Sequence, residues 1–169
     1  YPQPSLKPGM RKNVLKGAYH FRHYPAQSVS GTQEKNAVTL LGSGAILTEV
    51  LAAAGELSSQ GIACDVFSVT SWTELARDGQ RSEHSSNSSD QPAMPFIEEQ
   101  LQNSKGPIIA ASDYVRMLPE SIRAYVPAGR KYITLGTDGF GRSDTRAELR
   151  QHFGVNAQAI VQMALKQLA

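Results

Sequence analysis

The sequence predicts an α/β fold in three layers, with a mixed, mainly parallel β-sheet covered by helices on both faces. Short apolar runs alternate along the chain with segments whose apolar residues recur at helical spacing. The runs contain few alternating polar residues, which is typical of parallel strands buried on both faces. At 169 residues, 40% of them hydrophobic and 19% charged, the chain has the composition of a single globular domain.

Composition and charge argue against several classes of protein. The formal net charge of +2 is too small to predict nucleic-acid binding, and no apolar run reaches the roughly 18 residues of a membrane span. The single cysteine, Cys64, lies in an apolar run, which predicts a buried, unreactive thiol. Residues 1–13, rich in proline, are expected to form a linker or arm, and residues 14–169 the domain.

The first half of the chain contains the clearest strand–helix alternation. Aromatic residues predict an edge strand at 14–24 that can run antiparallel, and polar residues predict a loop at 25–36. The apolar strand at 37–41 leads into a helix with one apolar face, which ends at Gly61. A second buried strand is expected at 62–69.

The elements of the second half are bounded by residues that cap, turn or break the chain. We expect a short helix at 73–77 that is stopped by Asp78-Gly79, and then a serine-rich exposed loop at 81–91. A helix at 95–102, begun by proline, leads to a strand at 107–111, and a helix from Asp113 to about 125, broken at Pro119, leads to a strand at 131–135. Two helices follow, the first capped by Ser143 or Asp144 and the last capped by Asn156.

The most distinctive motif is the loop that follows the last expected strand, Leu135-Gly-Thr-Asp-Gly-Phe-Gly-Arg-Ser-Asp144. Its glycines predict sharp turns or a close approach to another group, and strand-to-helix loops carry the binding groups of α/β sheets. Two interpretations stay open. The side chains of Asp138, Phe140, Arg142 and Asp144 form a partner surface, or Arg142 only braces the neighbouring carboxylates.

A second candidate is the turn Gly42-Ser43-Gly44. It follows a strand and opens a helix, as a dinucleotide fingerprint does, but Leu47 stands where the third glycine is required. A tight turn is favoured, and a small anion bound at this helix N-terminus is the alternative.

The third candidate is the segment after the second strand. Trp72, at a strand end, predicts packing at a sheet edge or on a partner. Glu74, Arg77 and Asp78 share one helical face, where they form local ion pairs or interface contacts. His20 and His23 have no carboxylate or cysteine nearby in the sequence, so we expect no metal site.

Catalytic motifs are missing from the sequence. It has no P-loop and no nucleophile elbow, and we expect neither catalytic nor cofactor-binding residues. Asp138-Gly139 is similar to the start of a thiamine diphosphate motif, but Thr137 replaces its first glycine and the metal-ligand asparagine does not follow.

Two long motifs resemble the homodimeric pyruvate dehydrogenases, the decarboxylating first components of the bacterial complex, in the transketolase superfamily. The motifs are residues 68–79 and residues 135–144 with Leu149-Arg-Gln-His-Phe153 after them. Leu41-Gly-Ser-Gly44 and Ser112-Asp-Tyr114 stand in the matching order. The resemblance covers residues 12 to 168 and implies the fold of a transketolase C-terminal domain.

The resemblance also implies a function for the parent enzyme. That enzyme decarboxylates pyruvate in the cytoplasm and reductively acetylates lipoyl groups of dihydrolipoyl acetyltransferase. Thiamine diphosphate and Mg²⁺ are held by its preceding domains, whereas this domain serves the homodimer and the assembly and is inactive alone. The alternative is a stand-alone interaction module or an anion-binding domain.

Overall fold

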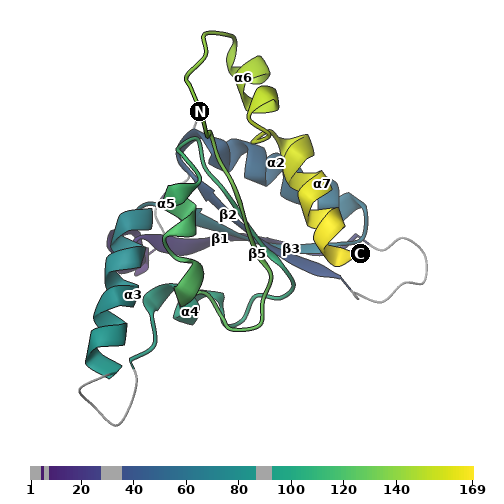
Figure 1. Ribbon diagram of the computed structural model, residues 1–169. Helices are drawn as coiled ribbons and strands as arrows, with labels where there is room; N and C mark the ends of the chain where they lie inside the picture. The colour runs from purple at the N-terminus through teal and green to yellow at the C-terminus, as the bar shows by residue number, and fades with distance from the viewer. Residues whose placement is uncertain (1–4, 6–7, 28–35, 87–92) are drawn as a thin grey trace.

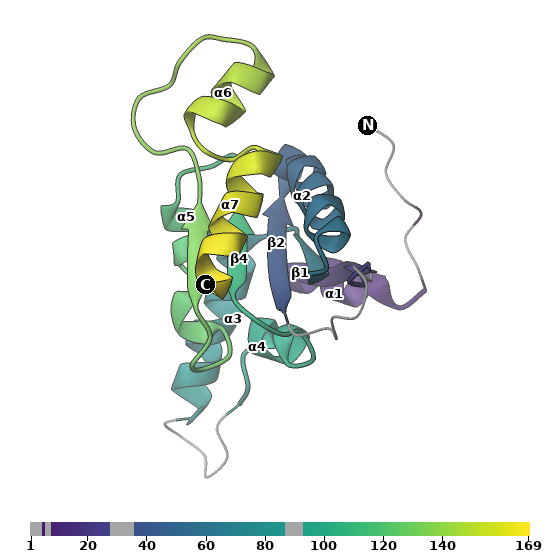
Figure 2. The same ribbon diagram turned by 90° about the vertical axis from the view of Figure 1, so that its right-hand side faces the viewer.

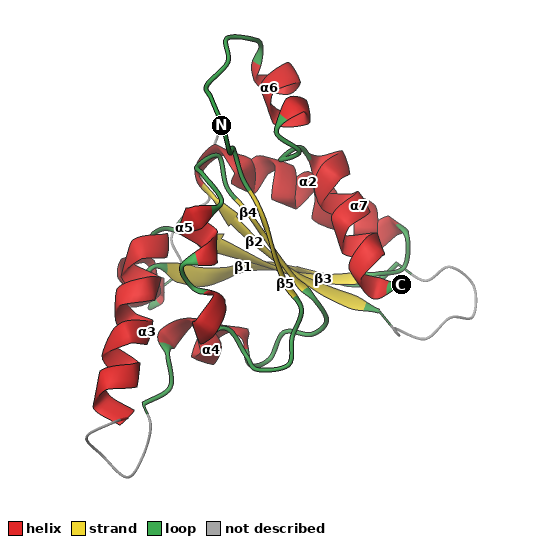
Figure 3. Ribbon diagram, viewed as in Figure 1, coloured by secondary structure: helices red, strands yellow, loops and turns green. Residues whose placement is uncertain are grey.

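The computed structural model describes residues 5, 8–27, 36–86 and 93–169, and it contains a twisted five-stranded sheet (Figures 1 and 3). The strand order is β1-β3-β2-β4-β5. The strands are β1 (Ala18–Tyr24), β2 (Ala37–Ser43), β3 (Ala63–Val69), β4 (Ile108–Ala111) and β5 (Tyr132–Leu135). Only β1 runs antiparallel to its neighbour in this sheet. The predicted α/β class and the antiparallel edge strand are therefore confirmed.

Helices cover both faces of the sheet and bury two separate cores (Figure 3). The helices α2 (Leu47–Ser59) and α7 (Ala157–Leu168) lie on one face, and α3 (Trp72–Ser86), α4 (Phe96–Leu101) and α5 (Met117–Glu120) on the other. Successive strand residues point to opposite faces. Leu40 of β2 accordingly joins the first core and Leu41 the second.

A helix precedes the edge strand, so the strand is shorter than expected. Residues assigned to the end of the arm and the start of the strand form α1 (Met10–Lys16). That helix ends at Gly17, whose φ is 109°. A Cβ on Gly17 would lie 2.7 Å from the carbonyl oxygen of Ser71, so the close crossing selects glycine and starts β1 at Ala18.

The helix expected to stop at Asp78-Gly79 continues through both residues to Ser86. A Cβ on Gly79 would lie 2.3 Å from ring atoms of Tyr125, so this glycine lets the ring pack against the helix and does not mark its end. Residues 81–86 are therefore helical, not a loop. The remainder of the expected serine-rich loop, 87–91, lies outside the described residues, as do residues 28–35 of the first expected loop.

The segment after β4 does not form the long helix predicted from Asp113. Its first residues form backbone hydrogen bonds with the loop after β5, and the chain then forms α5 and a 3₁₀ turn, η2 (Arg123–Tyr125). Asp113 therefore caps no helix. In the next helix, α6 (Arg146–His152), Thr145 is the N-cap instead of Ser143 or Asp144, and its side chain accepts a hydrogen bond from Glu148 N. The predicted cap of α7 is confirmed, because Asn156 Oδ1 accepts from Ala159 N at 3.0 Å.

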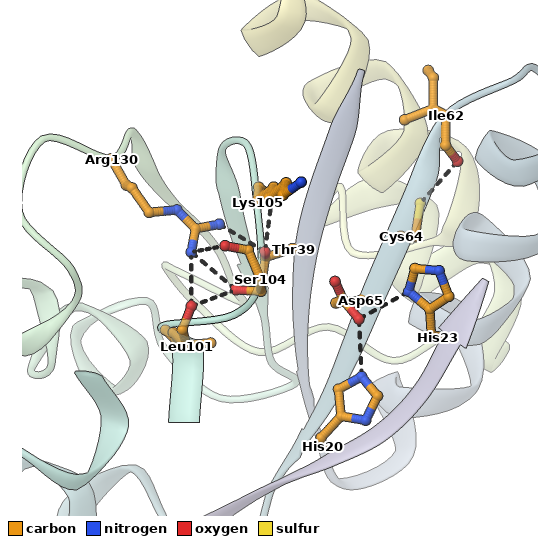
Figure 4. Close-up of polar contacts among 10 residues, drawn as sticks. All are labelled: His20, His23, Thr39, Ile62, Cys64, Asp65, Leu101, Ser104, Lys105 and Arg130. Carbon is orange, nitrogen blue, oxygen red and sulfur yellow. Dashed lines mark hydrogen bonds and ion pairs between the residues drawn. The ribbon is translucent and has the colours of Figure 1, made fainter. Parts of the chain in front are cut away.

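Arg130 holds together the edge of the sheet where the parallel strands begin (Figure 4). Its Nη2 donates to Thr39 Oγ1 at 2.7 Å and to the carbonyl oxygen of Gly106 at 2.6 Å. Its Nη1 donates to Ser104 Oγ at 2.9 Å and contacts the carbonyl oxygen of Leu101 at 3.3 Å. Burial lowers the pKa of this guanidinium, and its hydrogen bonds are made to uncharged groups.

Candidate functional site

Three loops meet at the edge where the parallel strands end, which is where α/β sheets carry their binding groups. Two hydrogen bonds from Thr137 tie the loop after β5 to the loop after β4: its N donates to Tyr114 O and its Oγ1 to Asp113 O, both at 2.9 Å. Gly136 permits this contact, because a Cβ there would lie 2.7 Å from Tyr114 O. Ser43 Oγ donates to Ser112 Oγ at 2.9 Å and joins the loop after β2.

Asp138 is the carboxylate that braces the glycine-rich loop. Its Oδ1 accepts from Arg116 N at 2.9 Å and its Oδ2 accepts from Arg116 Nε at 2.6 Å. The backbone hydrogen bond and then the side-chain bond from Arg116 lower the pKa of Asp138. The bracing cation is thus Arg116, which the sequence interpretation did not consider, and not Arg142.

Because the pKa of Asp138 is lower in the folded chain than in the unfolded chain, its contribution to stability is complete above the unfolded value of about 4. It is lost as the pH falls through the lower, folded value. We expect the Arg116 amide to lose hydrogen-exchange protection under acid earlier than the amides of β4. Amide NMR on wild type and Asp138→Asn measures this, and the same acid response in both proteins would contradict the assignment.

Phe140 and Arg142 extend from the braced part of the loop. The side chain of Phe140 is 96% exposed, and no hydrogen bond or ion pair joins Arg142 to the rest of the described chain. The loop and α6 project from the body of the domain, as two perpendicular views show (Figures 1 and 2). A groove of about 780 Å³ lies between them, with Ile46, Phe153 and Val155 among its apolar lining residues.

Glu49 of α2 ties α6 and α7 to the body. Its Oε1 accepts from Arg150 Nη1 of α6 at 2.7 Å, and its Oε2 accepts from the backbone N of Ala157, at the start of α7, at 2.9 Å. Both charged side chains are largely buried, with 21% of Glu49 and 24% of Arg150 exposed. The carboxylate therefore sets the position of the groove's helical wall.

We expect the nearly isosteric Glu49→Gln substitution to destabilise the domain by about 1–2 kcal/mol, because it leaves Arg150 without its anion. The loss is local to α6, so amide exchange at residues 146–152 accelerates more than exchange in β2. Hydrogen exchange by mass spectrometry measures both. Glu148→Gln, on the exposed side of α6, is the control, and an equal effect of the two substitutions would refute the role of Glu49.

The turn Gly42-Ser43-Gly44 is tightly packed against the helix that it opens. A Cβ on Gly42 would lie 2.9 Å from Val50 Cγ2, and Gly44 has a φ of 54°. A Cβ on Gly44 would lie 3.4 Å and 3.5 Å from the two carboxylate oxygens of Asp113. Since a carboxylate repels other anions, this turn does not fit the diphosphate of a nucleotide or of thiamine diphosphate.

The segment that begins at Trp72 contributes to the second core and to a local ion-pair cluster. Trp72 is buried in that core and not on an open sheet edge, and its Nε1 has no partner among the described residues. Glu74 Oε1 contacts Arg81 Nη2 at 2.8 Å, and Oε2 contacts Arg77 Nη1 at 3.5 Å. Asp78 Oδ2 accepts from Phe96 N at 2.7 Å, which fixes α4. Of the two interpretations, these contacts favour local structure.

The edge strand contains a cluster that the sequence order did not reveal (Figure 4). His20 Nε2 and His23 Nδ1 each lie 3.0 Å from Oδ1 of Asp65, which β1–β3 pairing brings opposite His23. A carboxylate that is distant in the sequence therefore lies near the two histidines. Both contacts have hydrogen-bond length, and the described chain contains no group of three or more such side chains that could hold a metal ion.

The predicted burial of Cys64 is confirmed. Its side chain is buried in the first core, and its Sγ contacts the carbonyl oxygen of Ile62 at 3.6 Å. Burial and then the charge of Asp65 raise the pKa of the thiol to about 12. A thiol that stays protonated at neutral pH is a poor nucleophile.

Comparison with known proteins identifies the family. The family model for the transketolase-like TK C-terminal domain matches residues 17–156. The chain belongs to this family. The match includes the whole sheet and all three loops at its carboxyl edge.

Among the relatives of this transketolase-like domain are pyruvate dehydrogenase E1 components. Identity is 41% over 174 residues with the protein from Cupriavidus necator and 42% over 172 residues with that from Escherichia coli K12. Each alignment covers all of this chain but 18% of the relative. The chain therefore corresponds to the C-terminal region of these proteins and spans about a fifth of their length.

Solved transketolase structures share the fold. The Campylobacter jejuni transketolase superimposes with a TM-score of 0.58 at 22% identity, over 90% of this chain and 19% of that one. The Pichia stipitis transketolase complex with sedoheptulose 7-phosphate gives 0.56 at 16% identity, over 98% and 20%. At these identities the likeness concerns the fold alone.

Among the described helices, none is both long and apolar enough to cross a membrane.

Proposed function

We propose that this chain is the C-terminal domain of a pyruvate dehydrogenase E1 component. The parent enzyme decarboxylates pyruvate and reductively acetylates the lipoyl groups of dihydrolipoyl acetyltransferase in the cytoplasm. The observation that carries the proposal is the identity of about 41% with such components along the entire chain. The glycine-rich loop and the Trp72 segment, which first indicated the family, both lie inside the aligned region.

Within that enzyme, we assign the domain to the architecture of the homodimer and of the complex, not to catalysis. Thiamine diphosphate, which stabilises the carbanion formed on decarboxylation, and its Mg²⁺ belong to the preceding domains. Asp113 against the Gly44 turn supports this division, because the turn disfavours a diphosphate. The exposed Phe140, and Arg142, which forms no ion pair with a described residue, support a role in contacts with a neighbouring domain, subunit or acetyltransferase.

The isolated chain is expected to be inactive. Purified chain supplied with pyruvate, thiamine diphosphate and Mg²⁺ should reduce no electron-accepting dye above the rate of a blank. The full-length enzyme under the same conditions is the positive control. Turnover by the isolated chain would refute the division of roles.

The architectural role is tested in the full-length enzyme. We expect the double substitution Phe140→Ala and Arg142→Ala to weaken dimerisation or binding of the acetyltransferase, measured by sedimentation velocity. Arg77→Ala, on the exposed face of α3, is the matched control, because its ion pair is exposed and local. Unchanged sedimentation and activity in the double variant would contradict the proposal.

The alternative of an interaction module is favoured by the same exposed loop, and it differs in requiring no catalytic parent. The alternative of an anion site at Gly42-Ser43-Gly44 is disfavoured by the carboxylate of Asp113. Titration of the chain with inorganic phosphate, followed by the amide signals of these three residues, distinguishes the two alternatives.

A further inference from the structure

Exposed apolar side chains lie on the loops that follow β4 and β5 and at the start of α5. Tyr114 is 61% exposed, Met117 77% and Phe140 96%, and Val115 is exposed beside them. The bonds between Arg116 and Asp138 hold the two loops together. We call these four side chains the carboxyl-edge ridge. Several large exposed apolar side chains on segments that are tied together indicate a surface that contacts another molecule.

Cations lie next to this ridge, in the groove beneath the loop. Arg142, Arg146 and Arg150 all line it. Glu49 neutralises Arg150, whereas no ion pair joins Arg142 or Arg146 to any described residue. Among the described residues that line the groove, Asp113 is the one with a carboxylate. Asp144 and Glu148 line an adjacent hollow, which Arg142 lines as well. The groove therefore offers two guanidinium groups that form no ion pair with a described residue, and Arg146 is the one that does not also line the hollow of Asp144 and Glu148.

We propose that the ridge and groove dock an acidic peptide segment that carries an apolar or aromatic side chain. Guanidinium groups bind carboxylates with paired hydrogen bonds, and arginine and aromatic residues are enriched at the centres of protein interfaces. The apolar side chain of the segment lies on Leu149 and Phe153, which line the groove and are only partly buried. Its carboxylates lie against Arg142 and Arg146.

A peptide fits this surface better than a small anion does. Small-ligand sites enclose most of the ligand's surface, whereas Phe140 stands almost fully in solvent and the groove is bordered by a projecting loop and helix (Figure 2). The ridge and the groove together also extend over two loops and one helix. Such a surface suits an extended segment that contacts several side chains in turn.

This inference rests on the proposed function in one respect, that the glycine-rich loop is a partner surface. Its test uses the 169-residue chain alone, so that it can fail while the role in the full-length enzyme stands. The probes are two short fluorescein-labelled peptides. One has a single phenylalanine flanked by glutamates, and the other has a lysine in place of each glutamate.

In fluorescence anisotropy at low salt, we expect the glutamate peptide to bind at least about tenfold more tightly than the lysine peptide, with an affinity that falls as salt is added. The double substitution Arg142→Glu and Arg146→Glu should weaken binding by about tenfold or more. Phe140→Ala should weaken it as well. Arg11→Glu with Lys12→Glu, which changes the net charge equally on exposed residues of α1, should leave binding unchanged.

Three results would overturn the proposal. The lysine peptide binds as tightly as the glutamate peptide, or the control pair weakens binding as much as the groove pair does. The third such result is that neither peptide binds. Inorganic phosphate is then titrated in, and the amide signals of residues 142–146 are followed. A phosphate shift in that case assigns the groove to small anions. Circular dichroism of each variant confirms that the fold is retained.

Discussion

The Gly106→Ala substitution is expected to destabilise the domain by about 4 kcal/mol or more, enough to leave much of the chain unfolded. Gly106 has a φ of 74°, a conformation that alanine adopts only under strain. A Cβ there would lie 1.7 Å from the carbonyl oxygen and 2.6 Å from the carbonyl carbon of Ala37. Ala37 is the first residue of β2, so these backbone atoms cannot move without disturbing the centre of the sheet.

The backbone of Gly106 also holds the side chain of Arg130 in place. The carbonyl oxygen of Gly106 accepts from Arg130 Nε at 2.8 Å as well as from Nη2. Displacement of residue 106 therefore also breaks the network around that arginine. We expect urea unfolding, followed by circular dichroism, to show either no folded baseline or a much lower midpoint.

Gly129→Ala separates backbone strain from the clash. Gly129 has a φ of 77°, nearly that of Gly106, but no atom lies within 4 Å of its added Cβ. It should lose only about 1 kcal/mol, the cost of the left-handed conformation. Equal losses in the two variants would mean that the close crossing with Ala37 does not control stability.

Elements set by local pattern were predictable from the sequence, and those set by distant contacts were not. The strands at 37–43 and 63–69 follow from apolar runs, and the last helix follows from Asn156 and its apolar face. The length of α3 could not be predicted from local pattern, because Gly79 makes room for the ring of Tyr125 and does not end the helix. With the sequence interpreted as a loop after Gly79, Arg81 could not be recognised as the partner of Glu74.

The candidate site shows the same division. A strand-to-helix loop rich in glycine indicated the carboxyl edge of the sheet, and the structure places this loop there. The cation that braces Asp138 comes from the loop after β4, and no local pattern connects Arg116 to it. Likewise, Asp65 joins His20 and His23 only through strand pairing. A correct strand order, deduced first, could have found both contacts, because it brings the two loops and the two strands together.

Replacing Arg130 by methionine is expected to destabilise the domain by about 3–5 kcal/mol. Methionine keeps much of the apolar stem but removes every donor. The partly buried carbonyl oxygen of Ser104 then loses its hydrogen bond, the exposed carbonyl oxygen of Gly106 loses two, and that of Leu101 keeps only its bonds from Ser104. Ser104 itself is buried, so water cannot replace the lost bonds freely. Urea unfolding measures the loss. Arg142→Met, at an exposed arginine that bonds to no residue in the described part of the chain, should stay within about 0.5 kcal/mol of wild type.

Arg130→Lys tests whether the geometry of the guanidinium or its charge matters. A lysine retains the charge but cannot reach Thr39, Ser104 and Gly106 together, because its donors radiate from one atom. We therefore expect it to recover little of the loss. A double-mutant cycle with Thr39→Val should give a coupling energy of about 1 kcal/mol between residues 130 and 39. Thr39 Oγ1 accepts from Arg130 and also donates to Lys105 O at 3.1 Å, so it connects β2 to the segment before β4. If Arg130→Lys is as stable as wild type, the positive charge alone holds this edge of the sheet, and the hydrogen-bond account is wrong.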